Sequence, residues 1–176
     1  MPNKKHEQLL AFACERIPLL ISLLLIFLFF MPLNSVQFNY FRPSVGIICV
    51  YYWRLNRQLI FGYFSAFIIG LMLDVYGSTP LGLNALLLLL LVAITTMPSQ
   101  YLRTSSFSVR WLIFGFICMA IMLLKWLLLM LYFWHFLSLT EIMLGYFSTV
   151  MFYPLIATLN VWIAQKFLPP ENIDEL

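Results

Sequence analysis

Two ionisable side chains, Asp74 and Lys125, lie inside long apolar stretches of this sequence. A charge in such surroundings is costly unless it meets a partner or water. Asn84 follows Asp74 by one short turn and could join them through hydrogen bonds. We therefore predict a polar cluster of Asp74, Asn84 and Lys125. Either Asp74 pairs with Lys125, or it accepts hydrogen bonds from Ser78 and Thr79 in the next turn while Lys125 extends toward the interface.

These residue types do not make a catalytic set. A lone carboxylate, amine and amide lack the nucleophile–base arrangement of covalent catalysis. The sequence also has no paired carboxylates and no glycine-rich phosphate loop. Its three cysteines and two histidines show no disulfide or metal-ligand spacing. We expect no enzymatic activity, no cofactor, no metal and no nucleic-acid partner.

The composition indicates that membrane-spanning helices position the polar cluster. Of 176 residues, 63% are hydrophobic and only 10% are charged, whereas soluble domains are about 45–50% apolar and about 25% charged. We expect an all-α integral membrane protein with one domain, since a membrane-spanning helix needs about 20 apolar residues. Six segments qualify or nearly qualify: 17–33, 38–53, 59–76, 81–98, 111–134 and 142–167. No small-residue cleavage site follows the first, so we interpret it as an uncleaved span.

The second segment is short, and the placement of positive charge decides whether it spans. With six spans and the N-terminus inside, eight Lys and Arg residues face the cytoplasm and one faces outward. Without the second span, three face inward and six outward, against the excess of positive charge in cytoplasmic loops. We predict six transmembrane helices, with cytoplasmic segments 1–16 and 168–176 at the two ends. Arg42 and Arg54 are expected to reach the two interfaces from the short helix.

The third segment carries small residues at intervals of four, Gly62, Ala66 and Gly70, which end at Asp74. This spacing places them along one helix face, and small residues let another helix approach closely in a membrane. The face could pack inside the bundle or receive the helix of another protein. In the hairpin that follows, we expect Gly77 to end the helix with a positive φ, and Pro80 to start the next helix.

The stretch GLMLDVYGSTPLGLNA resembles the bacterial rod shape-determining MreD family. Gly70, Asp74, Pro80 and Gly82 match the central signature of that family. The chain length, the short second helix ending in YYWRLNRQ and the basic loop before the fifth helix are also similar. The resemblance implies a multi-pass protein of the bacterial cytoplasmic (inner) membrane, with a bundle similar to the substrate-binding subunits of energy-coupling-factor transporters.

The resemblance further implies a non-catalytic scaffold for lateral peptidoglycan synthesis and cell shape. Its expected partners are the single-span protein MreC and, indirectly, MreB, RodA and the elongation transpeptidase. We predict that the MreC helix packs on Gly62, Ala66 and Gly70. The alternative is a vitamin-type transporter subunit, whose outward pocket would use the polar cluster and Glu141. The sequence leaves open whether the chain forms homo-oligomers.

Overall fold

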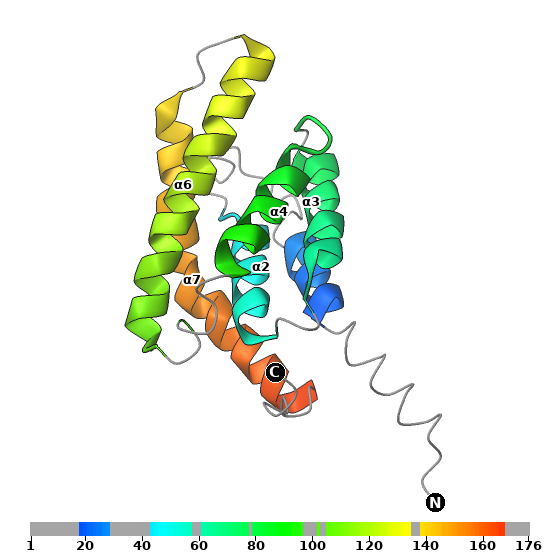
Figure 1. Ribbon diagram of the computed structural model, residues 1–176, viewed down its shortest axis with the longest axis vertical. Coiled ribbons are helices and arrows are strands. Elements are labelled where there is room, and N and C mark those ends of the chain that lie inside the picture. The colour runs from blue at the N-terminus through cyan, green and yellow to red at the C-terminus, as the bar shows by residue number, and fades with distance from the viewer. Residues whose placement is uncertain are drawn as a thin grey trace, which may run out of the picture.

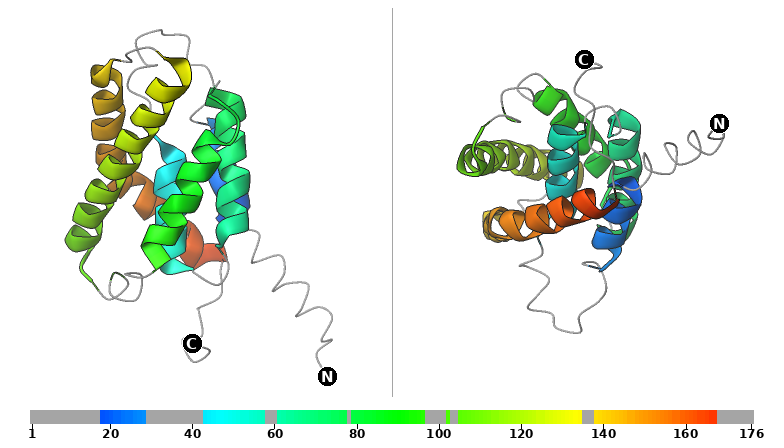
Figure 2. Two further views of the ribbon diagram at one scale, coloured as in Figure 1. Left: turned by 45° about the horizontal axis from the view of Figure 1, so that its top comes forward. Right: turned by 90° about the horizontal axis from the view of Figure 1, so that it is seen from below.

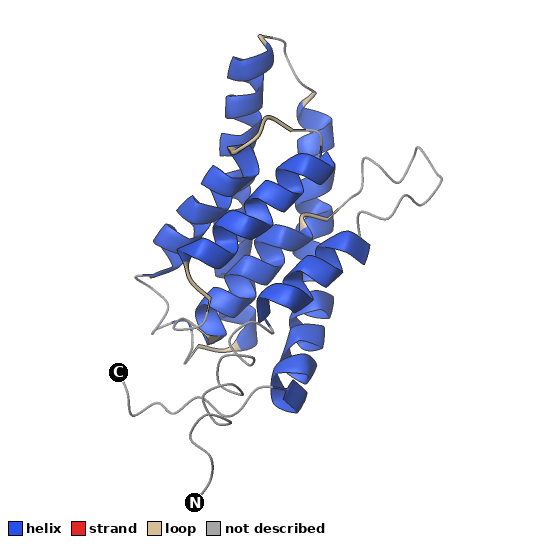
Figure 3. Ribbon diagram, turned by 90° about the vertical axis from the view of Figure 1, so that its right-hand side faces the viewer, coloured by secondary structure: helices blue, strands red, loops and turns tan. Residues whose placement is uncertain are grey.

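The computed structural model describes residues 18–28, 43–57, 61–77, 79–96, 102, 105–134 and 138–167. Six helices and no strand lie within these residues (Figure 1, Figure 3). They are Pro18–Leu28, α2 (Val45–Asn56), α3 (Tyr63–Gly77), α4 (Leu83–Thr96), α6 (Phe107–Phe133) and α7 (Leu139–Phe167). The all-helical prediction is confirmed. The predicted terminal segments 1–16 and 168–176 lie outside the described residues.

Two helices, Phe107–Phe133 and Leu139–Lys166, are long and apolar enough to cross a membrane, and Pro18–Leu28, α3 and α4 are shorter apolar helices. Successive helices run in opposite directions, so α6 begins and α7 ends at the same end of the bundle (Figures 1 and 2). This alternation is what six consecutive spans require. The number of spans and the cytoplasmic location of both termini remain predictions.

The short helix α2 forms the centre of the bundle. Every residue from Val45 to Leu55 is buried, and the helix packs mainly against α4 and α7. At its start, the backbone N–H of Ser44 donates to Thr149 Oγ1 of α7 at 2.9 Å. The helix has 12 residues, which gives it a length of about 18 Å. Because other helices cover it, α2 does not need the length of a lipid-exposed span.

The end of α2 corrects our expectation for Arg54. This side chain is only 9% exposed, and it does not extend away from the bundle. Its guanidinium donates to the carbonyl of Phe61 at 3.4 Å and to Thr96 Oγ1 of α4 at 3.1 Å. Acceptors in the adjacent chain segments thus bind the two terminal nitrogens of the guanidinium, whereas its Nε is buried without an acceptor among the described residues. The other flanking residue, Arg42, lies outside the described residues.

Aromatic rings join α2 to the two long helices. Tyr153 of α7 stacks on Phe114 of α6 with ring centroids 4.3 Å apart, and Tyr51 of α2 lies 5.1 Å from Phe114. These three rings are buried, and offset aromatic pairs add to the stabilisation from burial alone. Farther along, α6 and α7 extend past the α3–α4 turn (Figure 1). That part of α6 exposes Leu127 and Leu131, as expected for surfaces that face lipid.

Candidate functional site: the α3–α4 polar turn

Asp74 is the centre of a closed hydrogen-bond network at the turn between α3 and α4. Its side chain is 1% exposed. Oδ1 accepts from Thr79 Oγ1, from the backbone N–H of Asn84 and from Asn84 Nδ2, each at 2.9 Å, and Oδ2 accepts from the backbone N–H of Gly82 at 2.9 Å. Asn84 Nδ2 also donates to Thr79 Oγ1 at 2.9 Å. A carboxylate has about four lone-pair sites, two on each oxygen. Three donors therefore converge on Oδ1, and one described donor reaches Oδ2.

The network explains why a carboxylate stands at this place in an apolar hairpin. The first backbone N–H groups of a helix have no partner within the helix, and a carboxylate beside them is favoured by the helix dipole. Asp74 reaches across the turn and accepts from two such groups at the start of α4, those of Gly82 and Asn84. It therefore caps α4 from the end of α3. We predicted this alternative from the sequence with Ser78 and Thr79 as donors. Thr79 takes that part, and Ser78 lies outside the described residues.

The turn itself corrects the prediction for Gly77. Gly77 is the last residue of α3, and the positive φ belongs to Gly82, at 94°. The left-handed region favours glycine because a Cβ would clash there. At Gly82 this conformation brings the backbone N–H to Asp74. The carbonyl of Pro80 accepts from the N–H of Leu83 at 3.1 Å. Pro80 therefore lies in the turn before α4, which begins at Leu83, and not at the helix start that we predicted.

Lys125 contributes to this site only from a distance. It is half-buried in α6 and interacts electrostatically with Asp74. The described residues give the two no ion pair, and the hydrogen bonds described for Asp74 all come from the turn and the start of α4. The structure thus brings Asp74 and Asn84 into direct contact, with Lys125 as a nearby charge.

The small-residue face of α3 packs inside the protein. A Cβ on Gly70 would lie against the Cα of Ala85 in α4 and 2.6 Å from its backbone nitrogen. Ala66 is fully buried, whereas Gly62 precedes the helix and has open space around it. At Gly70 and Ala66 the predicted partner groove is therefore covered by the chain itself. This is the internal-packing alternative, and it corrects the placement of the MreC helix on this face.

Sequence reasoning did not connect Asn160 with other residues, and the structure gives it neighbours. Asn160 of α7 is completely buried beside Cys49 of α2, which also contacts Ser22 of the first helix. The amide lies near the Cys49 thiol, but neither amide atom has a hydrogen bond of normal geometry in the described part of the chain. No sequence spacing could show this, because the three residues come from three separate helices.

The Asn160 amide leads to a stability prediction. Burying a polar group without hydrogen bonds is costly, and an apolar replacement of similar shape can remove that cost. We expect Asn160→Leu to be neutral or to raise the free energy of unfolding by about 1 kcal/mol. Thr149→Val is the matched control, because Thr149 is equally buried but accepts from Ser44 and donates to Gly145 at 2.6 Å. The control should lose about 1–2 kcal/mol. Thermal unfolding in detergent measures both, and equal losses would contradict the prediction.

Comparison with known proteins gives one family and one relative. The family described as "rod shape-determining protein MreD" matches residues 8–163. An uncharacterized protein of Rickettsia prowazekii (strain Madrid E) is 29% identical over 100 residues, which cover 55% of this chain and 57% of that protein. The chain thus spans less than two thirds of the length of this relative. No solved structure matches the chain.

Proposed function

From the premise that this chain belongs to the family of the rod shape-determining protein MreD, we propose that it is a non-catalytic scaffold of the wall-elongation machinery in the bacterial inner membrane. The family supports a role in determining rod shape. The finer proposal is that the chain binds the transmembrane helix of MreC. Through MreC it supports lateral peptidoglycan synthesis by RodA and its transpeptidase. MreB is a further indirect partner.

The observation that carries this proposal is the burial of Asp74 among donors of its own hairpin. A general base or a ligand-binding carboxylate must be within reach of a substrate, whereas Asp74 is 1% exposed and accepts from four donors of the hairpin. This carboxylate therefore holds α3 and α4 together. The same fact weighs against the transporter alternative, because two of the polar groups that would line an outward pocket, Asp74 and Asn84, hydrogen-bond to each other. The protein therefore acts by binding other proteins through the surfaces of its helices.

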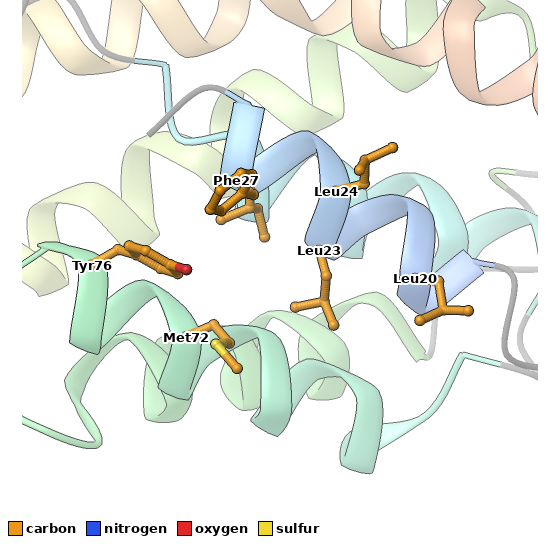
Figure 4. Close-up of a pocket in the computed structure, with 7 residues that line it drawn as sticks. Leu20, Leu23, Leu24, Phe27, Met72 and Tyr76 are labelled. Carbon is orange, nitrogen blue, oxygen red and sulfur yellow. The ribbon is translucent and has the colours of Figure 1, made fainter. Parts of the chain in front are cut away.

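An apolar groove supports a different place for the partner helix. Helix Pro18–Leu28 and α3 form an apolar groove of about 290 Å³ on the face of α3 that α4 does not cover (Figure 4). Leu20, Leu23 and Leu24 line one side, Met72 and Tyr76 line the other, and Phe27 lies near Tyr76 with ring centroids 6.3 Å apart. A groove between two helices is the shape into which the side-chain ridge of a third helix fits. We propose that the MreC helix occupies this groove.

Filling the groove tests the proposal. Leu24 and Met72 are 58% and 43% exposed, so tryptophan at either place can leave the fold intact while it blocks a helix. We expect Leu24→Trp and Met72→Trp each to lower the amount of co-purified MreC about tenfold, because overpacking typically costs about 1–3 kcal/mol. The measurement is affinity purification of the tagged chain from membranes in mild detergent, with MreC quantified by mass spectrometry.

Leu155→Trp is the matched control, since Leu155 is 60% exposed on α7, away from the groove. It should retain the MreC signal. If both groove variants also retain it, this surface is not the binding site. Recovery of an ATPase pair and a coupling membrane subunit in place of MreC would support the transporter alternative.

A further inference from the structure

Hydrogen-bond donors gather at the end of the bundle where α2 ends and α6 begins. Arg110 lies in the first turn of α6. It is close to Tyr51 and Tyr52 of α2 and to Tyr153 of α7. The hydroxyl of Tyr51 donates to the carbonyl of Arg110 at 3.1 Å. The Arg110 guanidinium interacts electrostatically with the hydroxyl groups of all three tyrosines. Three helices thus bring four polar side chains to one place.

Several of these donors have no acceptor among the residues that the structure describes. Tyr52 and Tyr153 are 6% and 3% exposed, and within the described residues their hydroxyl groups form no hydrogen bond. The Nε of Arg110 is buried and is also without an acceptor there. Ser106, the residue that caps α6, makes no side-chain hydrogen bond to the helix start. Buried donors are normally satisfied, so the buried Nε of Arg110 indicates an acceptor beyond the described residues.

The charges around the site indicate an anion. In the described part of the chain, Asp74 and Glu141 are the carboxylates, and they lie at the α3–α4 turn and in the first turn of α7, at the other end of the helices. Arg57 lies close to Tyr52 and adds a second cation beside Arg110. The positive end of the α6 dipole has the same sign. An anionic group with several oxygens would match these donors.

We propose that Arg110, Tyr52 and Tyr153 bind the phosphate group of an anionic phospholipid in the adjacent leaflet. A lipid is favoured over free phosphate by an apolar groove of about 270 Å³ between α6 and α7, which begins at the next residue, Trp111. It continues along Leu112, Gly115 and Phe116 of α6, opposite Tyr146 and Val150 of α7. An acyl chain in this groove would start at the depth of the donors. The proposal does not depend on the proposed function.

The test uses the full chain in a neutral detergent. Dioctanoyl phosphatidylglycerol, dioctanoyl phosphatidylcholine and inorganic phosphate are titrated separately, and the unfolding temperature is measured. A ligand that binds the folded state raises this temperature. We expect phosphatidylglycerol in large excess to raise it by roughly 5 °C. Phosphatidylcholine, whose phosphate is balanced by a cation, and inorganic phosphate should each give less than half of that shift.

Three variants locate the binding. Arg110→Gln and Tyr52→Phe should each lose at least half of the phosphatidylglycerol shift. Lys166→Gln should keep it, because the Lys166 ammonium lies 4.9 Å from the Trp162 ring centroid and outside this group. Tyr52→Phe removes one oxygen and keeps the ring, so the test stands even if Arg110→Gln does not fold. Full shifts in both site variants would overturn the proposal, and an equal shift with inorganic phosphate would overturn the lipid assignment.

Discussion

Asp74→Ala is expected to lower the free energy of unfolding by about 3–5 kcal/mol, because several buried donors lose their acceptor and each unsatisfied group costs about 1–3 kcal/mol. Four donors lose their acceptor at once, and those from Gly82 and Asn84 are in or beside the first turn of α4. Alanine supplies no oxygen to replace it, and water has little access, since Asp74 is 1% exposed. The start of α4 should therefore unravel first. Denaturation in detergent with helicity as the signal measures the loss.

Two variants calibrate this result. Asp74→Asn keeps one acceptor oxygen and should lie between the wild-type chain and Asp74→Ala. Glu141→Gln removes an exposed carboxylate from the first turn of α7 and should change stability by no more than about 0.5 kcal/mol. If Asp74→Ala is as stable as Glu141→Gln, the network does not stabilise the hairpin. Asp74 would then have no structural role in the hairpin.

Gly70→Ala is expected to cost about 3 kcal/mol, a large loss for one methyl group. The added carbon would meet the backbone of Ala85, with its nitrogen 2.6 Å away. Backbone cannot move aside as a flexible side chain can, so α3 and α4 would have to separate. This pair makes the most extensive helix contact in the described bundle. The expected result is a lower unfolding temperature and reduced protein in the membrane.

Gly145→Ala is the control for Gly70→Ala. Gly145 lies in α7, and a Cβ there would meet no atom within 4 Å. Alanine favours helix over glycine by about 0.5–1 kcal/mol, so this variant should be neutral or slightly more stable. Opposite signs at the two glycines would show that close approach, and not glycine content, decides the outcome. Equal effects would refute the packing of Gly70 on Ala85.

Periodic and local features could be predicted from the sequence. Apolar runs indicated the helices. Most ends differ from the observed ones by a few residues, as for 59–76 against Tyr63–Gly77, but the segment 38–53 begins seven residues before Val45–Asn56. The capping of the turn by Asp74 was foreseen as one of two alternatives, because Thr79 and Asn84 follow within ten residues. Such contacts join residues that are close together in the sequence, so they can be predicted from it.

Contacts between distant segments could not be predicted. Arg54 was expected at an interface, but its partners, Phe61 and Thr96, are known only once α2 and α4 are packed. The positive φ was assigned to Gly77 by its place after an apolar run, whereas the chain turns at Gly82. The small-residue spacing around Gly70 fits a neighbouring helix of the same chain or of another protein equally well. Only the structure shows that the neighbour is Ala85 of α4.

The reach of Asp74 across the turn also bears on how the protein enters the membrane. When α3 leaves the ribosome, its carboxylate has none of its later donors, and an aspartate alone in lipid is costly. Asn84 is ten residues farther along, so its amide arrives about 0.5–2 s later at ordinary rates of synthesis. In the predicted six-span arrangement, α3 would until then carry an unpartnered carboxylate in the bilayer. We expect α3 to wait at the insertion machinery and to move into lipid together with α4, so that the hairpin and not the single helix is the unit of insertion.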